Sequence, residues 1–160
     1  MNRRVVETPV GPLTLVASGR GLREVLWAAQ GEPSHDSDEL GAAAILDAAA
    51  TQLEEYFAGR RRAFDVPLDL LGTEFQVEAW LALAEIPYGG TVSYGEQARR
   101  LGRPHAARAV GAANGRNPLS IVLPCHRVVG SDGSLTGYGG GLDVKLWLLE
   151  HERAAARADR

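Results

Sequence analysis

Residues 93–115 read SYGEQARRLGRPHAARAVGAANG and predict two short helices joined by a tight turn. Ser93-Tyr94-Gly95-Glu96 has the spacing of a capping box, which marks the start of the first helix. Gly102-Arg103-Pro104 provides the turn, and the second helix is expected from about His105 to Ala113, ending at Asn114-Gly115. Two such helices form a candidate helix-turn-helix, although helical pairs of this kind occur in many proteins.

The second of these helices has unusually small side chains. Arg108 is its only long polar residue, because most neighbouring positions are alanine or glycine: Ala106, Ala107, Ala109, Gly111, Ala112 and Ala113. Such a helix can bring its backbone into the DNA minor groove, which is about 6 Å wide, and one arginine can fill the space left by an extruded base. Close packing against another helix explains the same composition equally well.

Basic residues are segregated along the chain, although its formal net charge is −3. The window 97–131 contains no Asp or Glu and holds Arg99, Arg100, Arg103, His105, Arg108, Arg116, His126 and Arg127. Acidic residues are concentrated elsewhere, as in Glu32 to Glu39. This segregation is typical of a surface that binds phosphate groups, and a solvated basic face is the alternative.

Cys125, the one cysteine of the chain, lies in Pro124-Cys125-His126-Arg127-Val128. A free thiol has a pKa of about 8.5, so a reactive cysteine needs a nearby base or positive charge, and this segment supplies both. The alternative is a small buried side chain, because the apolar run Ile121-Val122-Leu123 precedes it. A single cysteine excludes an intramolecular disulfide and argues against a structural zinc site.

The N-terminal half predicts a small antiparallel sheet followed by a helix. Short apolar segments separated by turn residues form a meander: Val5-Val6, Leu13 to Val16 and Leu22 to Trp27. An amphipathic helix that Gly59 ends is predicted by the spacing of Ile45, Leu46, Ala49, Leu53 and Phe57. Phe64 to Val66 are expected to add a strand.

We therefore expect an α/β N-terminal domain over residues 1–66, a linker over 67–72 and a C-terminal domain over 73–160. Thr73-Glu74-Phe75-Gln76 opens the C-terminal domain with a capping box. That domain is expected to be mostly α-helical and winged-helix-like, with the helix-turn-helix and the cysteine inside it. The sequence lacks the apolar runs of a signal peptide or a membrane span, which predicts a cytoplasmic protein.

Five motifs occur in order through the C-terminal half and together resemble a known family. They are Ser93-Tyr94-Gly95-Glu96, Ala107-Arg108-Ala109-Val110-Gly111, Asn117-Pro118, Pro124-Cys125-His126-Arg127-Val128 and Gly137-Tyr138-Gly139-Gly140-Gly141-Leu142. From about Gly72 to Glu152 the chain resembles the O6-alkylguanine-DNA alkyltransferases, and the preceding sheet and helix are consistent with the N-terminal domain of that family. Some members hold zinc in that domain through cysteines that are missing here, so no metal is expected.

The resemblance implies DNA repair by transfer of an alkyl group from O6-alkylguanine to Cys125, with O4-alkylthymine as a further candidate lesion. Tyr94 stands where the family places a donor that neutralises guanine as the bond breaks. His126 is expected to reach the thiol through one water molecule, because adjacent side chains diverge. The full set of catalytic positions that the resemblance implies is Cys125, His126, Glu152, Tyr94 and Asn117.

Two of these positions are implied to act through other groups. Glu152 would orient the histidine from the margin of a C-terminal helix, whose inward face is predicted to be Val144, Leu148 and His151. Asn117 would hydrogen-bond the turn that presents the cysteine.

The resemblance also implies the DNA-binding and lesion-binding residues. DNA contacts are expected from Arg108, Ala107, Ala109, Gly111, Asn114, Arg116 and Arg127. The pocket for the flipped base is expected from Tyr94, Val128, Tyr138, Gly139 and Gly140. The thioether product resists hydrolysis, so each molecule is expected to act once without a cofactor. The implied partner is double-stranded DNA containing alkylated guanine, bound by a monomer that can cluster along the duplex.

Three other functions fit parts of the sequence. A non-catalytic lesion-recognition protein would flag alkylated DNA, although the presence of Cys125 argues against it. A helix-turn-helix regulator would use Cys125 as a redox sensor and read the major groove, for which the second helix has few suitable side chains. A Cys-His hydrolase would turn over activated esters catalytically.

Overall fold

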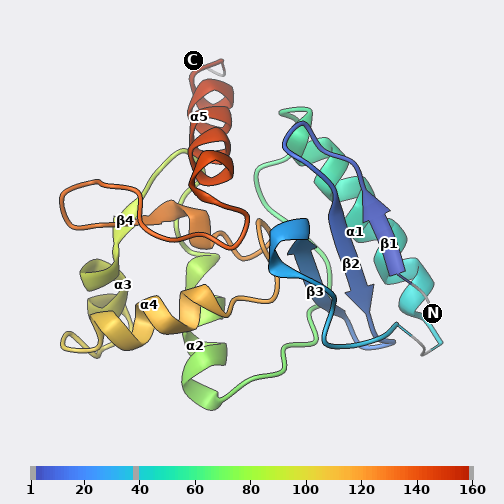
Figure 1. Ribbon diagram of the computed structural model, residues 1–160, viewed down its shortest axis with the longest axis horizontal. Helices are drawn as coiled ribbons and strands as arrows, with labels where there is room; N and C mark the ends of the chain where they lie inside the picture. Colours follow the sequence, from blue (N-terminus) through green and yellow to red (C-terminus); the bar gives the residue numbers. More distant parts are fainter. Residues whose placement is uncertain (1–2, 38–39, 159–160) are drawn as a thin grey trace. The chain divides into compact units, whose positions relative to one another are not determined.

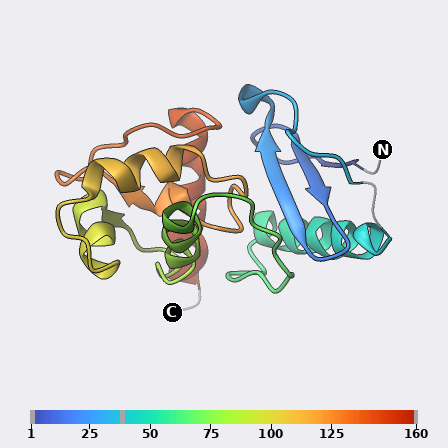
Figure 2. The ribbon, with the colours of Figure 1, turned by 90° about the horizontal axis from the view of Figure 1, so that it is seen from below.

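The computed structural model describes residues 3–37 and 40–158, and the chain divides into two compact units (Figures 1 and 2). The first unit extends to Leu71 and also includes Pro118–Val122. The second unit comprises Gly72–Asn117 and the chain from Leu123 onward.

An antiparallel sheet and one long helix make up most of the first unit. The sheet has the order β1 (Arg3–Val6), β2 (Leu13–Ala17) and β3 (Leu22–Trp27), followed by the short 3-10 helix η1 (Ala28–Gln30). Helix α1 (Ala42–Phe57) lies along one face of this sheet in Figures 1 and 2. Its buried side is apolar, because residues three or four apart share one helix face: Ala42, Leu46, Ala49, Ala50, Leu53 and Tyr56. The predicted meander and amphipathic helix are confirmed.

The end of α1 also follows the sequence prediction. Gly59 has φ 78°, a left-handed conformation that glycine adopts without the steric penalty of a Cβ atom, and its N–H donates to the carbonyl of Tyr56 at 3.0 Å. The strand expected over Phe64 to Val66 is wrong, because the described backbone is irregular there. The next residues instead make a single bridge beside β3, where Leu22 N donates to Pro67 O at 2.8 Å.

Residues 118–122 pair with β3 and belong to the first unit, although the sequence places them in the predicted C-terminal domain, residues 73–160. Val25 N donates to Pro118 O at 2.8 Å, and Ser120 N donates back to Val25 O at 3.3 Å. Ile121 in this segment has φ 74°, which is rare for a β-branched residue, and its side chain is buried. These hydrogen bonds to β3 therefore fix the backbone of residues 118–122, just before the cysteine.

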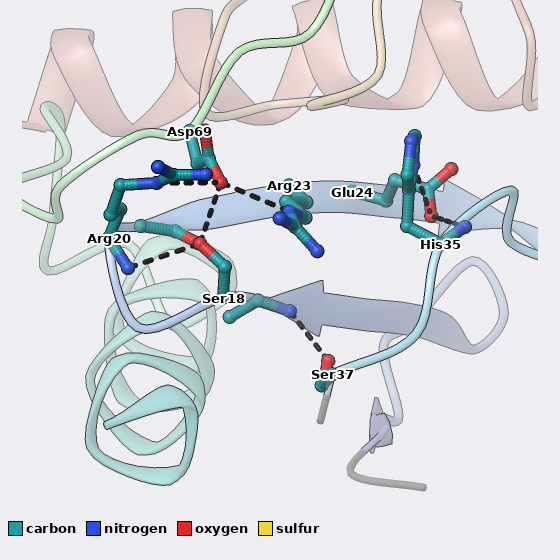
Figure 3. A network of polar contacts seen from close by, with 9 residues as sticks. Ser18, Arg20, Arg23, Glu24, His35, Ser37 and Asp69 are labelled. Atoms are coloured by element: carbon teal, nitrogen blue, oxygen red, sulfur yellow. Dashed lines mark hydrogen bonds and ion pairs between the residues drawn. The ribbon is translucent and has the colours of Figure 1, made fainter. Parts of the chain in front are cut away.

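A group of polar side chains beside β3, which we call the Asp69 cluster, comprises Ser18, Arg20, Arg23 and Asp69 (Figure 3). Asp69 Oδ2 accepts hydrogen bonds from Ser18 Oγ at 2.6 Å and Arg23 Nε at 3.0 Å, and Arg20 Nε lies 3.8 Å away. The Ser18 hydrogen bond and the two arginines lower the pKa of the Asp69 carboxyl. The cluster ties the turn between β2 and β3 to the chain that follows α1.

The second unit is mostly helical, as predicted. Its elements are α2 (Glu74–Leu83), β4 (Val92–Ser93), α3 (Tyr94–Arg100), α4 (Ala107–Gly115), the 3-10 helix η2 (Cys125–Arg127), β5 (Val128–Val129) and α5 (Leu142–Ala158). The strands β4 and β5 form a short parallel pair. Both hydrogen bonds of the predicted capping box at Thr73 are present. At Ser93 only half of the second box forms, because the Glu96 carboxylate pairs with Arg99 and Arg100 instead.

Buried polar contacts fix the helix-turn-helix of α3 and α4. Gln97 and Asn114 exchange side-chain amide hydrogen bonds of 2.8 and 3.2 Å across the two helices. Trp80 Nε1 on α2 donates to Ala113 O at 2.7 Å, so α2 supports α4 from the inside. The outer side of α4 is left exposed at Arg108 and Ala109.

Candidate active site and DNA-binding surface

Cys125 begins η2, directly after a turn that a buried asparagine holds in place. Asn117 Nδ2 donates to Leu123 O at 2.8 Å, and Cys125 N donates to the same carbonyl at 2.8 Å. Asn117 also hydrogen-bonds the Cys125 sulfur, which favours its ionised form. Cys125 as a residue is half-buried. The asparagine thus fixes both the turn and the cysteine that follows it.

Cys125 lines a cavity of about 630 Å³ formed entirely within the second unit. A cavity of this size is typical of a site for a small molecule or a single nucleobase. Its walls come from α3, α4, η2 and the loop before α5: Tyr94, Ala107, Arg108, Gly111, Asn114, Gly115, Cys125, Thr136, Gly137, Tyr138 and Gly139. Cys125 and the small-residue helix α4 therefore line one pocket.

Behind the cysteine lies a buried charged group, which we call the Glu152 cluster: His126, Arg127 and Glu152. His126 Nε2 is 2.6 Å from Glu152 Oε2. The Arg127 guanidinium donates to both carboxylate oxygens, at 2.8 and 3.1 Å, and also to Ile86 O at 2.7 Å. None of the three side chains is more than 6% exposed.

Burial and pairing set the protonation states in this cluster. Burial alone would raise the pKa of Glu152, but His126 and Arg127 outweigh it and lower that pKa to about 2. Burial lowers the pKa of His126 despite the neighbouring carboxylate, which favours a neutral ring at pH 7. A carboxylate only accepts hydrogen bonds, so we assign the ring hydrogen to Nε2 and a lone pair to Nδ1. Among the residues that the structure describes, Nδ1 has no hydrogen-bond partner.

A buried lysine adds positive charge near the thiol. Burial raises the pKa of Cys125, while the Asn117 hydrogen bond and the charge of Lys145 oppose that rise. Lys145 on α5 is fully buried, and its Nζ donates to Thr136 O at 2.9 Å and Gly137 O at 3.4 Å. Burial lowers the pKa of Lys145, and attraction to Cys125 raises it. The two groups therefore favour each other's charged forms.

The comparisons with known proteins agree with this geometry. Residues 74–154 match the family model of the 6-O-methylguanine DNA methyltransferase, DNA binding domain. Residues 1–70 match the model of the 6-O-methylguanine DNA methyltransferase, ribonuclease-like domain. The chain belongs to the 6-O-methylguanine DNA methyltransferase family.

Full-length relatives place the chain well inside this family. The methylated-DNA–protein-cysteine methyltransferase of Mycobacterium bovis is 52% identical over 159 residues, which cover 98% of this chain and 94% of the relative. The protein of the same name from Methanosarcina acetivorans is 47% identical over 149 residues, covering 92% and 96%. The crystal structure of Mycobacterium tuberculosis OGT in complex with DNA superposes with a TM-score of 0.87 and 48% identity, over 97% of this chain and 94% of that one. The family and fold class expected from the sequence are confirmed.

The methyltransferase fold brings together most of the residues singled out from the sequence, but four have other surroundings. Arg127 was expected at the DNA; its side chain is buried and bound to Glu152, so that expectation is wrong. Val128 is fully buried in β5 and lies outside the residues that line the pocket. Asn114 lines the pocket, but its side chain is bonded inward to Gln97. Gly140 lies next to the lining residues rather than among them.

Two residues of this site were missed by the sequence reading, Lys145 and Thr136. The inward face of α5 is formed by Lys145, Leu148, Leu149 and Glu152, not by the predicted Val144, Leu148 and His151. The spacing of three, four and seven residues was visible in the sequence, but a lysine is not expected in a buried stripe. Thr136 gave no signal, because its role depends on a contact with distant Tyr94.

Two negative findings concern the described residues only. Within residues 3–37 and 40–158, no group of three or more His, Cys, Asp or Glu side chains is arranged to hold a metal ion. No helix in the same ranges is both long and apolar enough to cross a membrane.

Proposed function

We propose that this chain repairs alkylated DNA by moving the O6 alkyl group of guanine to Sγ of Cys125, once per molecule. The observation that carries the proposal is the pocket in which Cys125, Tyr94 and Arg108 meet. Family membership supports the same reaction, and the M. tuberculosis relative of known structure is in complex with DNA.

Activation of the thiol follows from the Glu152 cluster. The lone pair on His126 Nδ1 accepts the thiol proton through a bridging water molecule, because adjacent side chains diverge and make a direct contact less natural. Glu152 fixes the tautomer through Nε2 and stabilises the imidazolium that forms. Asn117 and Lys145 stabilise the negative charge on sulfur. These groups thus offset the cost of placing a negative charge on the buried Cys125 sulfur.

The alkyl transfer is a displacement at carbon. The thiolate forms the S–C bond as the C–O6 bond breaks, and the electron pair of that bond goes to the guanine ring. Tyr94 neutralises the developing negative charge by donating its hydroxyl proton to the base, and solvent restores that proton after the base leaves. The proton taken from the thiol and the proton gained by guanine balance, so no cofactor takes part.

DNA recognition is assigned to α4 and its exit. Ala107, Ala109 and Gly111 let the helix backbone approach the minor groove, while the exposed Arg108 fills the space of the flipped base. Arg116, also exposed, is assigned a phosphate contact. No Asp or Glu occurs between residues 97 and 131, which favours this role electrostatically.

The flipped base is expected to lie against the loop before α5. Tyr138 lines the pocket with its ring edge-on to His126, the ring centroids being 6.4 Å apart. Gly139 and Gly140 allow the loop backbone to approach the base. O4-alkylthymine is a second candidate lesion for the same pocket.

The remaining parts of the proposal concern the whole chain. We assign a scaffold role to residues 1–66, a linker to 67–72, and binding and transfer to 73–160. The protein is proposed to act in the cytoplasm as a monomer that can cluster along double-stranded DNA.

The decisive experiment is intact-protein mass spectrometry after incubation with excess duplex oligonucleotide containing O6-methylguanine. One methyl group should be added, and peptide mapping should place it on Cys125, while a Cys125→Ser control stays unmodified. A thioether has no good leaving group, so the reaction should stop at one equivalent of repaired guanine. Repeated turnover with an unmodified thiol would contradict the proposal.

A further inference from the structure

Tyr94 is held by two contacts that position its hydroxyl in the pocket. Its phenolic oxygen lies 2.7 Å from Thr136 Oγ1, and either atom can be the donor. Its ring lies against α4 at Gly111, where an added Cβ atom would stand 3.7 Å from the ring. The hydroxyl is therefore fixed from the loop before α5, whereas the ring is fixed by the helix-turn-helix.

The backbone at Thr136 is itself held by hydrogen bonds from helix α5. Lys145 Nζ donates to Thr136 O and to Gly137 O, and the lysine is fully buried in α5. The loop is rich in glycine and would otherwise have considerable conformational freedom. The lysine therefore gives the Thr136 hydroxyl a defined position at the pocket wall.

We propose that Thr136 is a positioning residue for the alkyl transfer, and that its hydroxyl donates to the Tyr94 oxygen while Tyr94 donates to the bound base. This proposal rests on the proposed function of Cys125. A phenol has one proton, so once Tyr94 directs it to the base, Thr136 must be the donor of their shared hydrogen bond. That bond strengthens as negative charge builds on the Tyr94 oxygen, because hydrogen bonds to charged acceptors are the stronger ones.

Three variants separate the hydroxyl from the shape of the side chain. Thr136→Val removes the hydroxyl at nearly constant size, Thr136→Ser keeps it, and Thr91→Val makes the same change at an exposed threonine of the same unit. The single-turnover rate on duplex O6-methylguanine should fall about tenfold for Thr136→Val, the effect of losing one such hydrogen bond. Thr136→Ser should restore most of the rate, and Thr91→Val should match the wild type.

A second measurement tests whether Thr136 acts through Tyr94. Duplexes with O6-methyl-3-deazaguanine or O6-methyl-1-deazaguanine each replace one ring nitrogen by C–H, and one of them removes the acceptor of the tyrosine proton. On that base the wild type should be slow, and Thr136→Val should cause no further loss. If Thr136→Val lowered the transfer rate equally on all three bases, Thr136 would only shape the pocket, and the proposal would be overturned. A wild-type rate for Thr136→Val on O6-methylguanine would overturn it as well. Failure of the proposed function is separate, because the wild type would then leave Cys125 unmodified on O6-methylguanine.

Discussion

The Asp69 cluster and the Glu152 cluster contain the same pair of groups, a carboxylate and an arginine, yet they differ in what the pair can do. Asp69 lies beside β3 (Figure 3). Its side chain and that of Arg23 are 11% and 13% exposed, whereas its other arginine partner, Arg20, is 74% exposed. Glu152 is fully buried, and the third member of its cluster is a histidine, His126, with one ring nitrogen directed away from the carboxylate. The first cluster fastens two chain segments, whereas the second also holds His126, the proposed base, next to Cys125, the proposed nucleophile.

Burial explains why the two clusters have different chemistry. Solvent reaches the first cluster through Arg20 and partly screens its charges, whereas the second cluster is fully buried, where a charge left alone is strongly unfavourable. The buried Glu152 carboxylate therefore has a larger effect on the protonation and position of its neighbours than Asp69 has on its own neighbours. It keeps His126 in one tautomer and Arg127 in one position, which a screened pair would not do.

The largest predicted difference is in stability. Glu152→Gln leaves the Arg127 charge buried without its counter-charge, so the free energy of unfolding should fall by about 3 to 5 kcal/mol. Urea denaturation followed by tryptophan fluorescence measures it, with Glu150→Gln as a control at an exposed position of the same helix. If the two variants were equally stable, the distinction between the clusters would be lost.

Acid should reveal the same cluster in the wild type. The pKa of Glu152 is about 2 in the folded chain against an ordinary 4.5, so the unfolded chain binds the proton more readily. This contribution, on the order of 3 kcal/mol, is present above pH 4.5 and is lost as the pH falls toward 2. The lowered pKa of His126 acts in the same direction below about pH 6.5. Urea titrations at several pH values should show this loss, and Glu152→Gln should lack most of it; an unchanged acid response in that variant would assign the effect elsewhere.

An intermediate effect is expected at Lys145, which links the Glu152 side of the site to the pocket loop. Lys145→Met removes the positive charge that lowers the pKa of Cys125, so that pKa should rise and the transfer rate at pH 7 should fall by about tenfold. The rate should recover at higher pH, where the thiolate forms without help. Single-turnover rates between pH 6 and 10 measure the shift. A loss that is constant across this range would show that the lysine acts only by holding the loop.

The smallest effect should come from the Asp69 cluster. Asp69→Asn keeps the size of the side chain and weakens its contacts with Ser18 and Arg23, which should lower the free energy of unfolding by about 1 kcal/mol. The transfer rate should not change, because none of the residues of this cluster is among those that line the pocket. A lower transfer rate in this variant, measured at a temperature where it is folded, would show that the Asp69 cluster also contributes to the reaction and would contradict the comparison.

Local patterns in the sequence determined much of this protein. The meander, α1 with its Gly59 terminus and the capping box at Thr73 depend on residues close together in the chain, and they occur as predicted. The family resemblance rests on five motifs in order around Cys125, each a short run of residues, and the family is confirmed. Such features are readable because their physical cause lies within a few residues.

Only the tertiary structure decided which partners the polar side chains find. Arg127 lies beside Cys125 in sequence and suggested a DNA contact, yet packing of η2 against α5 places its guanidinium on Glu152. Lys145 faces inward and reaches the loop at Thr136, and Thr136 meets Tyr94 from 42 residues away. A side chain's own type limits which bonds it can form, but burial and the meeting of distant elements select which of them it does form.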